Sequence, residues 1–224
     1  MRTVLFPPVC MVCGQDGRPE IDCCSGCEAD LPMLAGQCAR CGLEMEHDVA
    51  LCGRCAMALP AFQGTWPGFS YQGVIERLIT RFKFHGDLAA GRLLADLLAR
   101  RLVELGAPRP DLMVPVPLHV RRRLQRGFNQ SALICRDLSA WFGRLPWSDS
   151  LRRHRATAQQ SDLPADQRTG NVRGAFGLDR LPPGVRHVAL VDDVMTTGST
   201  LNECARVLLQ AGVERVDVWV VARA

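Results

Sequence analysis

Eight cysteines near the start of the chain restrict the fold of the first 60 residues more than any other feature. They form four C-x-x-C pairs, each beginning 14 residues after the previous pair: Cys10/Cys13, Cys24/Cys27, Cys38/Cys41 and Cys52/Cys55. Only the first and third pairs are followed by glycine, at Gly14 and Gly42, so the true repeat is about 28 residues long. The pattern predicts two similar units in tandem.

Zinc is the metal ion that this cysteine pattern favours. A C-x-x-C turn directs two thiolates to one side, and two turns supply the four ligands of tetrahedral zinc. We expect two structural zinc sites, one of Cys10, Cys13, Cys24 and Cys27 and one of Cys38, Cys41, Cys52 and Cys55. An interleaved pairing of the turns and the use of Cys23 in place of Cys24 remain alternatives. Metal binding would supply on the order of 10 kcal/mol of folding free energy per site.

The compartment expected for the chain agrees with metal rather than disulfide chemistry. The first ten residues, MRTVLFPPVC, contain too short an apolar run for a signal peptide, and no segment approaches the roughly 20 apolar residues that span a bilayer. We therefore expect a cytoplasmic protein without a membrane segment. The cytosol keeps thiols reduced, which disfavours disulfides.

Length and composition indicate an ordinary globular protein. The 224 residues suit a zinc-binding domain at 1–60 and a larger domain at 61–224, and 47% of them are hydrophobic. The net charge is only +4, yet arginines cluster at 121–126 and 152–155, where they could meet phosphates. Lys83 is the only lysine among 27 basic residues, which base composition of the genome would equally explain.

Hydrophobic periodicity in the larger domain predicts alternating helices and strands. A linker is expected around 60–67, and a polar stretch at 152–173 is expected to be a long loop or lid. Apolar spacing predicts helices at 74–82, 87–105, 129–142 and 199–211, and strands at 111–119, 187–191 and 216–222. This order indicates an α/β fold in which helices flank a parallel sheet.

The stretch LVDDVMTTGSTL, at 190–201, is the most informative motif of this domain. Ligands of parallel sheets bind beyond the carboxyl ends of strands, where Asp192 and Asp193 are expected. The two carboxylates could be hydrogen-bonded by ribose hydroxyls, coordinated to a divalent cation or paired with arginines. The small residues of 196–200 lead into a helix, whose N-terminal amides favour phosphate. The alternative is a purely structural role, in which Ser199 or Thr200 caps a helix and the two acids are solvated.

The same stretch resembles the phosphoribosyl diphosphate (PRPP) binding motif of type I phosphoribosyltransferases. Together with VPVPLHVRRRLQRGFNQS at 114–131, the pattern from Arg155 through Arg168 and Asn171, and the cysteine-rich start, it resembles the ComF family over almost the whole chain. That family combines a zinc-ribbon region with a phosphoribosyltransferase-like domain. The resemblance implies a type I phosphoribosyltransferase-like parallel sheet flanked by helices.

The resemblance also implies roles for individual residues. Asp192 and Asp193 would contact ribose, and the 5-phosphate would be held by Thr196, Thr197, Gly198, Ser199 and Thr200. Val116 and Pro117 match the position of the pyrophosphate loop, and 152–173 matches a flexible lid. PRPP would be bound together with Mg²⁺. If the protein is an enzyme, Arg126, Arg155 and Arg168 are the expected clamp on the departing pyrophosphate.

Two classes of function are compatible with these patterns. The first is phosphoribosyl transfer from PRPP to an acceptor that the sequence does not identify, linked by the family resemblance to DNA uptake in natural competence. The second is a protein without catalysis that senses PRPP or a nucleotide, or that binds single-stranded DNA. The arginines of 121–126 with Phe128 are the expected DNA contact, whereas helical spacing predicts that Phe82 and Phe84 lie in the core.

Overall fold

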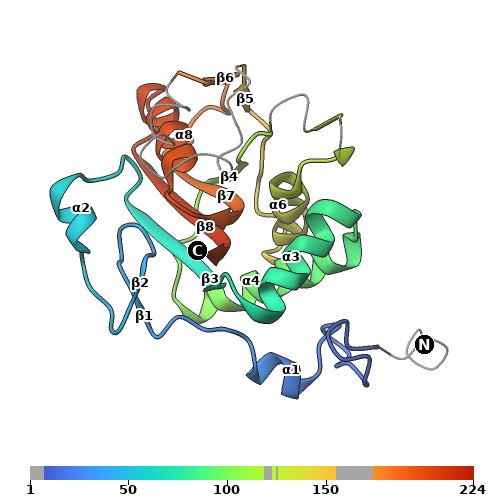
Figure 1. Ribbon diagram of the computed structural model, residues 1–224. Coiled ribbons are helices and arrows are strands. Elements are labelled where there is room, and N and C mark those ends of the chain that lie inside the picture. The colour runs from blue at the N-terminus through green and yellow to red at the C-terminus, as the bar shows by residue number, and fades with distance from the viewer. Residues whose placement is uncertain (1–7, 119–122, 125, 155–173) are drawn as a thin grey trace.

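A four-stranded parallel sheet forms the centre of the molecule in the computed structural model, which describes residues 8–118, 123–124, 126–154 and 174–224. Across the sheet the strands run in the order β3 (Gly64–Ser70), β8 (Arg215–Arg223), β7 (His187–Met195) and β4 (Leu112–Pro115) (Figure 1). All three neighbouring pairs are parallel. The predicted α/β class with a parallel sheet is confirmed.

Helices cover both faces of the sheet (Figure 1). On one face lie α3 (Gly73–His85), α4 (Leu88–Glu104) and α6 (Gln130–Trp141), and on the other lies α8 (Ser199–Gln210). Because side chains alternate along a strand, Ala189 and Val191 of β7 pack with the first group, whereas Val188 and Leu190 pack with α8. Both layers are apolar, which explains why the strands read as continuous hydrophobic runs.

Local sequence signals place the ends of the helices that frame the site. α3 stops at Gly86, whose φ of 66° is the left-handed conformation that glycine adopts readily. The Asp87 side chain then caps α4 by accepting a hydrogen bond from Ala90 N at 3.0 Å. Asn129 caps α6 in the same way, accepting from Ser131 N at 3.2 Å. The predicted ends at Gly86 and Asn129 are therefore confirmed.

The first strand of the sheet lies where a linker was predicted. Residues 60–67 were expected to form a linker, yet Gly64–Ser70 forms β3. β3 is an edge strand, so Pro67 needs no ladder partner on its outer side. On that side, Thr65 N donates to Ala39 O at 3.2 Å and Ser70 N donates to Pro32 O at 2.8 Å.

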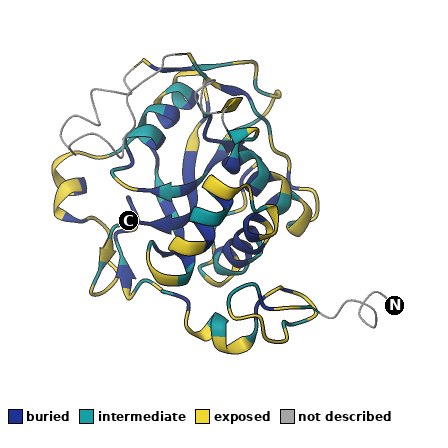
Figure 2. Cartoon of the chain, turned by 45° about the vertical axis from the view of Figure 1, so that its right-hand side comes forward, coloured by how far each residue is buried: buried dark blue, intermediate teal, exposed yellow. Residues whose placement is uncertain are grey.

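The N-terminal segment repeats its local structure with the predicted period. Helix α1 spans Ser25–Ala29 and α2 spans Gly53–Met57, so their bounds are offset by 28 residues. Between them, β1 (Gly36–Gln37) and β2 (Glu44–Met45) form a short antiparallel pair. This segment runs along the outside of the sheet domain (Figure 1), and much of its surface is exposed (Figure 2). The division into domains at residue 60 stays a prediction.

A second small antiparallel pair consists of β5 (Leu151–Arg153) and β6 (Phe176–Leu178). Arg152 and Arg153 were predicted to begin a loop, and this was wrong because they pair with Gly177 and Phe176. Most of the predicted lid, residues 155–173, lies outside the described residues. No helix in the described part of the chain is long and apolar enough to span a membrane.

Candidate functional site

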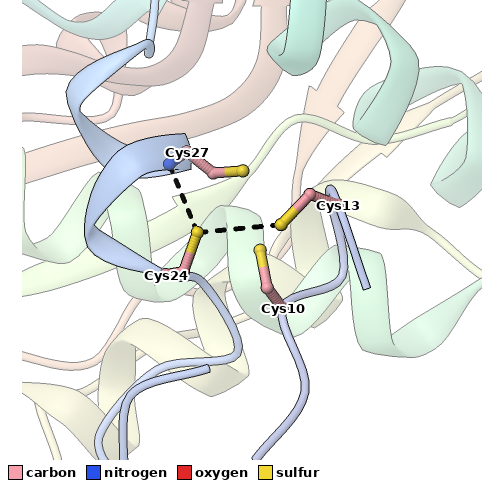
Figure 3. Close-up of side chains that lie close together, drawn as sticks. All are labelled: Cys10, Cys13, Cys24 and Cys27. Carbon is pink, nitrogen blue, oxygen red and sulfur yellow. Dashed lines mark hydrogen bonds between the residues drawn. The ribbon is translucent and has the colours of Figure 1, made fainter. Parts of the chain in front are cut away.

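The eight predicted zinc ligands lie in two groups of four. Within each group all sulfur atoms are within 4.8 Å of one another, and the groups are Cys10, Cys13, Cys24, Cys27 and Cys38, Cys41, Cys52, Cys55. Figure 3 shows the first group, in which the four sulfurs lie close together. The pairing that follows the 28-residue repeat is thus the one the fold adopts. Cys23 is fully buried beside the first group but is not part of it.

The geometry of both groups suits zinc. Four sulfurs at 2.3 Å from a tetrahedral zinc lie about 3.8 Å from one another. Cys13 Sγ and Cys24 Sγ are 3.7 Å apart, and so are Cys41 Sγ and Cys52 Sγ in the second group. Gly14 and Gly42 have φ angles of 77° and 64°, which the tight turn after each pair requires. The two tetrads therefore support structural zinc.

The acids of the 190–201 motif lie inside a strand rather than after it. β7 was predicted to end at residue 191 but continues to Met195, because β8 supplies a parallel partner as far as Arg223. On the other side, pairing with β4 stops at Val191. Asp192 and Asp193 therefore stand next to the point where β4 has already ended. The expected position at the carboxyl end of the sheet is retained.

Asp193 forms an ion pair that the sequence did not reveal. Its Oδ1 atom lies 2.8 Å from Lys83 Nζ on α3, and its side chain is only 9% exposed. Asp193 Oδ1 also accepts a hydrogen bond from Val194 N at 2.7 Å. The only signal in the sequence was that Lys83 is the single lysine of the chain, which base composition also explains. Lys83 gives this buried carboxylate a counter-charge.

Asp192 lies in a different environment from its neighbour. Its Oδ1 atom accepts hydrogen bonds from Ser131 Oγ and from Asp193 N, both at 2.9 Å. Burial and the nearby charge of Asp193 raise the pKa of Asp192 to about 7, although Lys83 opposes this shift. Asp192 can therefore change its protonation state near neutral pH. Ser131, at the start of α6, is a second contact that sequence reasoning missed.

The loop after β7 enters α8 through a glycine in the left-handed conformation. Gly198 has φ 77° and occupies the cap position of α8, and the side chain that accepts from the first backbone N–H of the helix is Thr197, whose Oγ1 lies 3.4 Å from Ser199 N. The alternative prediction, that Ser199 or Thr200 caps this helix, is therefore wrong. Thr197 Oγ1 lies 2.9 Å from Ser199 Oγ, so hydroxyl groups gather at this helix N-terminus. A Cβ atom on Gly198 would lie 2.5 Å from Met195 Cε.

The predicted pyrophosphate loop lies beside the acids. Val116 N donates to Val191 O at 2.9 Å, immediately before Asp192, and Val116 O accepts from Asn129 Nδ2 at 3.1 Å. Asn129 and Pro117 then line a pocket of about 170 Å³. The remaining lining residues are Leu118, Arg123, Asp149, Leu151, Arg152, Arg153 and His154. Arg152 is paired with Asp179 at 2.8 Å and with Asp149 at 3.6 Å, so the positive charge that this pocket offers to an anionic ligand comes chiefly from Arg123 and Arg153.

The predicted arginine clamp is only partly visible. Arg126 lies with its guanidinium carbon 5.2 Å from the centre of the Phe84 ring, a cation–π arrangement. Arg155 and Arg168 lie outside the described residues. Phe84 was predicted to be a core residue, but it is 66% exposed because it lies on the outer side of α3. Phe82, by contrast, is buried and stacks on Phe128 at 5.5 Å.

A second, larger groove of about 460 Å³ contains none of the predicted site residues. It is lined by residues 178–182, 184–185 and 211–213, between the end of β6 and the end of α8. Because α8 begins at the 196–200 loop, its C-terminal end points away from the acids. Volume alone therefore does not identify the functional site here.

Comparisons with known proteins agree with the cysteine pattern and extend over most of the chain. Residues 1–56 match the double zinc ribbon domain family. DNA utilization protein YhgH of Escherichia coli K12 is 40% identical over 207 residues, which cover 89% of each chain. Competence protein F of Haemophilus influenzae is 36% identical over 211 residues, covering 90% of each chain.

Solved structures show a weaker likeness to part of the chain. Glutamine phosphoribosylpyrophosphate (PRPP) amidotransferase from B. subtilis aligns with a TM-score of 0.38 and 21% identity. The alignment covers 58% of this chain and 26% of that chain. A likeness of this degree carries no inference about chemistry, which has to come from the residues of the site.

Proposed function

This chain belongs to the ComF family, the family of competence protein F and DNA utilization protein YhgH, and we propose that it binds the ribose 5-phosphate part of PRPP at the carboxyl end of β7. The observation that carries the proposal is the placement of Asp192 and Asp193 directly before the 196–200 loop and the N-terminus of α8. Sugar hydroxyls would meet carboxylate, and phosphate would meet backbone amides.

Asp192 is the better of the two acids for contacting ribose. Asp193 is committed to Lys83 and to Val194 N, whereas the partners of Asp192 among the described residues are a hydroxyl group and one amide. A carboxylate oxygen can accept hydrogen bonds from two neighbouring hydroxyls of a ribose. Asp193 would then act by fixing the strand end, with Lys83 neutralising its charge.

The loop is suited to a phosphate for two reasons. The N-terminus of a helix carries backbone N–H groups without intrahelical acceptors and the positive end of the helix dipole. The glycine at position 198 lets an anion approach the backbone closely, and the hydroxyls of Thr197 and Ser199 lie at the same place. These features together fit a dianionic phosphate monoester.

Magnesium would enter chiefly on the ligand. Among the described residues, no group of three or more carboxylate or histidine ligands gathers near Asp192. PRPP brings its own pyrophosphate oxygens, which are hard donors of the type that Mg²⁺ prefers. When bound, Mg²⁺ would neutralise negative charge that develops on the leaving pyrophosphate.

Phosphoribosyl transfer to an unidentified acceptor is the reaction that we assign to this site. The bond between the anomeric carbon and the pyrophosphate oxygen breaks, and a bond to the acceptor forms in its place. The pocket between Pro117 and Arg153 lies next to Val116, where the arginines would hold the pyrophosphate. Arg126, Arg155 and Arg168 remain the proposed clamp, and positioned cations of this kind favour the departing charge.

Thermal denaturation with ribose 5-phosphate, and with PRPP plus Mg²⁺, tests the binding proposal. A ligand at about 100 times its dissociation constant stabilises the folded protein by about 2.7 kcal/mol. Asp192→Asn should abolish this stabilisation. Asp111→Asn is the matched control, because Asp111 Oδ2 binds His187 N at the opposite end of β7. An unchanged shift in Asp192→Asn would contradict the proposal. Turnover of isotope-labelled PRPP with candidate acceptors then separates catalysis from sensing.

A second candidate function, binding of single-stranded DNA, is favoured by the surface around Phe84. An exposed aromatic ring with a guanidinium stacked on it is the type of platform on which nucleobases stack. Arg123 and Leu124, which precede Arg126 in the sequence, are also exposed. The names of the relatives, which refer to DNA utilization and to competence, support the same reading.

Salt-dependent capture of a labelled oligothymidine tests this second function. Phe84→Ala should weaken binding by about 1–3 kcal/mol, the range for loss of one stacked base. Trp141→Ala is the control, because Trp141 is also exposed, at 43%, but lies on α6 beside Phe142. Equal affinities for wild type and Phe84→Ala would exclude this surface as the DNA contact.

A further inference from the structure

The two cysteine tetrads have different surroundings. The first is partly exposed and lies against the helical face, where Arg81 Nη1 donates to Met11 O at 3.2 Å. The second tetrad is fully buried and belongs to the apolar cluster that also contains Phe62, Met195 and Leu201. Met195 and Leu201 flank the 196–200 loop on both sides. Only the second tetrad therefore shares its core with the proposed phosphate loop.

One buried arginine joins the second tetrad to this loop. Arg223 is the last residue of β8, and only 3% of its surface is exposed. Its Nε donates to Cys41 O at 3.2 Å, and its Nη1 donates to Met195 O at 3.0 Å. Cys41 is one of the predicted zinc ligands, and Met195 is the last residue of β7. A single guanidinium thus bridges a zinc ligand and the start of the loop.

The charge of a loaded tetrad would favour this bridge. Four thiolates and one Zn²⁺ carry a formal net charge of −2. The hydrogen-bond partners of Arg223 among the described residues are main-chain oxygens, at Cys41, Met195 and Ala224. Burial of a cation is costly, so a nearby anionic metal centre would stabilise the Arg223 guanidinium.

The chain that follows the second tetrad contacts the loop where it leads into α8. Ala61 N donates to Asn202 Oδ1, in the first turns of α8, at 2.7 Å. The Phe62 side chain is 1% exposed, and its Cζ lies 3.9 Å from the position of a Cβ on Gly198. The loop is therefore fixed at its start by Arg223, through Met195, and at its helical end by residues 61–62.

We propose that the second tetrad positions the 196–200 loop through Arg223, so that zinc at this tetrad and a sugar phosphate at the loop strengthen each other's binding. Arg223 is a positioning residue, because it contacts the ends of both sites and not the ligand. The first tetrad is a separate folding element without this coupling. The ligand half of the proposal rests on the proposed function. Coupling is reciprocal, so each ligand tightens the other by the same factor, typically about 5- to 150-fold.

Cysteine alkylation under a zinc chelator, read by mass spectrometry for each cysteine, tests the proposal on the full wild-type chain. Saturating ribose 5-phosphate should slow alkylation of the second tetrad at least about fivefold. Alkylation of Cys10, Cys13, Cys24 and Cys27 should not change. Equal protection of both tetrads would indicate general stabilisation and overturn the proposal, as would absence of protection when the ligand binds.

Hydrogen exchange without any ligand tests the coupling independently. As the chelator removes zinc from the second tetrad, the amides of 196–201 should lose protection in step with that loss. Protection that survives removal of this zinc would overturn the proposed positioning. If the coupling appears here but ribose 5-phosphate does not bind, the proposed function fails while the positioning role stands.

Substitution of Arg223 gives a matched comparison. Arg223→Lys keeps the charge but replaces two separate donor nitrogens, Nε and Nη1, with a single shorter ammonium group, so it should retain two zinc ions and lose the protection by ribose 5-phosphate. Arg81→Lys is the control, because Arg81 binds the turn of the first tetrad and no part of the loop. Full protection in Arg223→Lys would contradict the role of the guanidinium. If the variant misfolds, the wild-type measurements still decide.

Discussion

Lys83 Nζ lies 2.8 Å from Asp193 Oδ1. The only lysine of the chain is thus paired with the second acid of the Asp192–Asp193 dipeptide. The pair joins α3 to the end of β7, at the point where the proposed phosphate loop begins. Both side chains are largely buried, with exposed fractions of 20% for Lys83 and 9% for Asp193. The ion pair therefore fixes the position of the strand end.

Removal of the lysine charge should destabilise the fold. Lys83→Met leaves Asp193 as a buried carboxylate without a counter-charge, which costs about 3 kcal/mol. Urea denaturation measures the loss in the free energy of unfolding. Lys83→Arg keeps the charge and should lose less. The double variant Lys83→Met with Asp193→Asn should recover part of the loss, and a strictly additive loss would show that the pair is not coupled.

The stability contributed by Asp192 should depend on pH. Burial and Asp193 raise its pKa to about 7, so the folded protein keeps a proton that the unfolded chain has already released above about pH 4. The contribution of Asp192 to the free energy of unfolding therefore decreases as the pH rises from about 4 to 7. Asp192→Asn should remove this slope, so its stability relative to wild type should increase from pH 5 to pH 8.

Asp111 provides the control of opposite sign. Hydrogen bonds from His187 N and Arg186 N lower the pKa of Asp111, so its stabilising effect is lost only as the pH falls below the ordinary aspartate range. Between pH 5 and pH 8, Asp111→Asn should shift the free energy of unfolding by a constant amount. A slope for Asp192→Asn that equals the slope of wild type would contradict the assigned pKa.

Zinc content should distinguish two adjacent cysteines. Cys24→Ala removes a ligand of the first tetrad and should reduce tightly bound zinc from two ions per chain to one. Cys23→Ala should keep two, because Cys23 packs in the core and lies outside the tetrad. Atomic absorption on dialysed protein gives the stoichiometry. Loss of zinc from Cys23→Ala alone would reverse the assignment of the ligand.

A methyl group at position 198 should impair phosphate binding. Gly198→Ala forces alanine into a left-handed conformation, which costs about 1–2 kcal/mol, and places Cβ against Met195. Affinity for inorganic phosphate and ribose 5-phosphate, measured by calorimetry, should fall. Gly184→Ala is the matched control, because Gly184 has a similar φ of 82° and no atom within 4 Å of its Cβ position. Its stability should fall while its affinity stays at the wild-type value.

Features governed by short sequence spacing were predictable. The cysteine tetrads, the end of α3 at Gly86 and the cap of α6 at Asn129 each depend on residues close together in the chain. The parallel sheet followed from the alternation of apolar strands and helices. The placement of Asp192 at the carboxyl end of the sheet followed in turn, because that end is where a strand leads into the next helix.

Contacts between distant parts of the chain were not predictable. β3 was missed because Pro67 and its glycine neighbours oppose a strand locally, while pairing with β8 decides the outcome. Phe84 was placed in the core because α3 is amphipathic, and periodicity does not fix the exact edge of the apolar face. Lys83 and Arg223 acquire their partners only when the sheet assembles, so neither partner can be inferred from the sequence around them.

The hydrogen bonds from Thr65 N to Ala39 O and from Ser70 N to Pro32 O occupy the outer side of β3. An uncovered strand edge is a template for addition of a strand from another molecule, the first step of aggregation. The segment that covers β3 is held in shape by its cysteine tetrads. Zinc bound at the tetrads would therefore keep the edge of β3 covered, in addition to stabilising the segment that covers it.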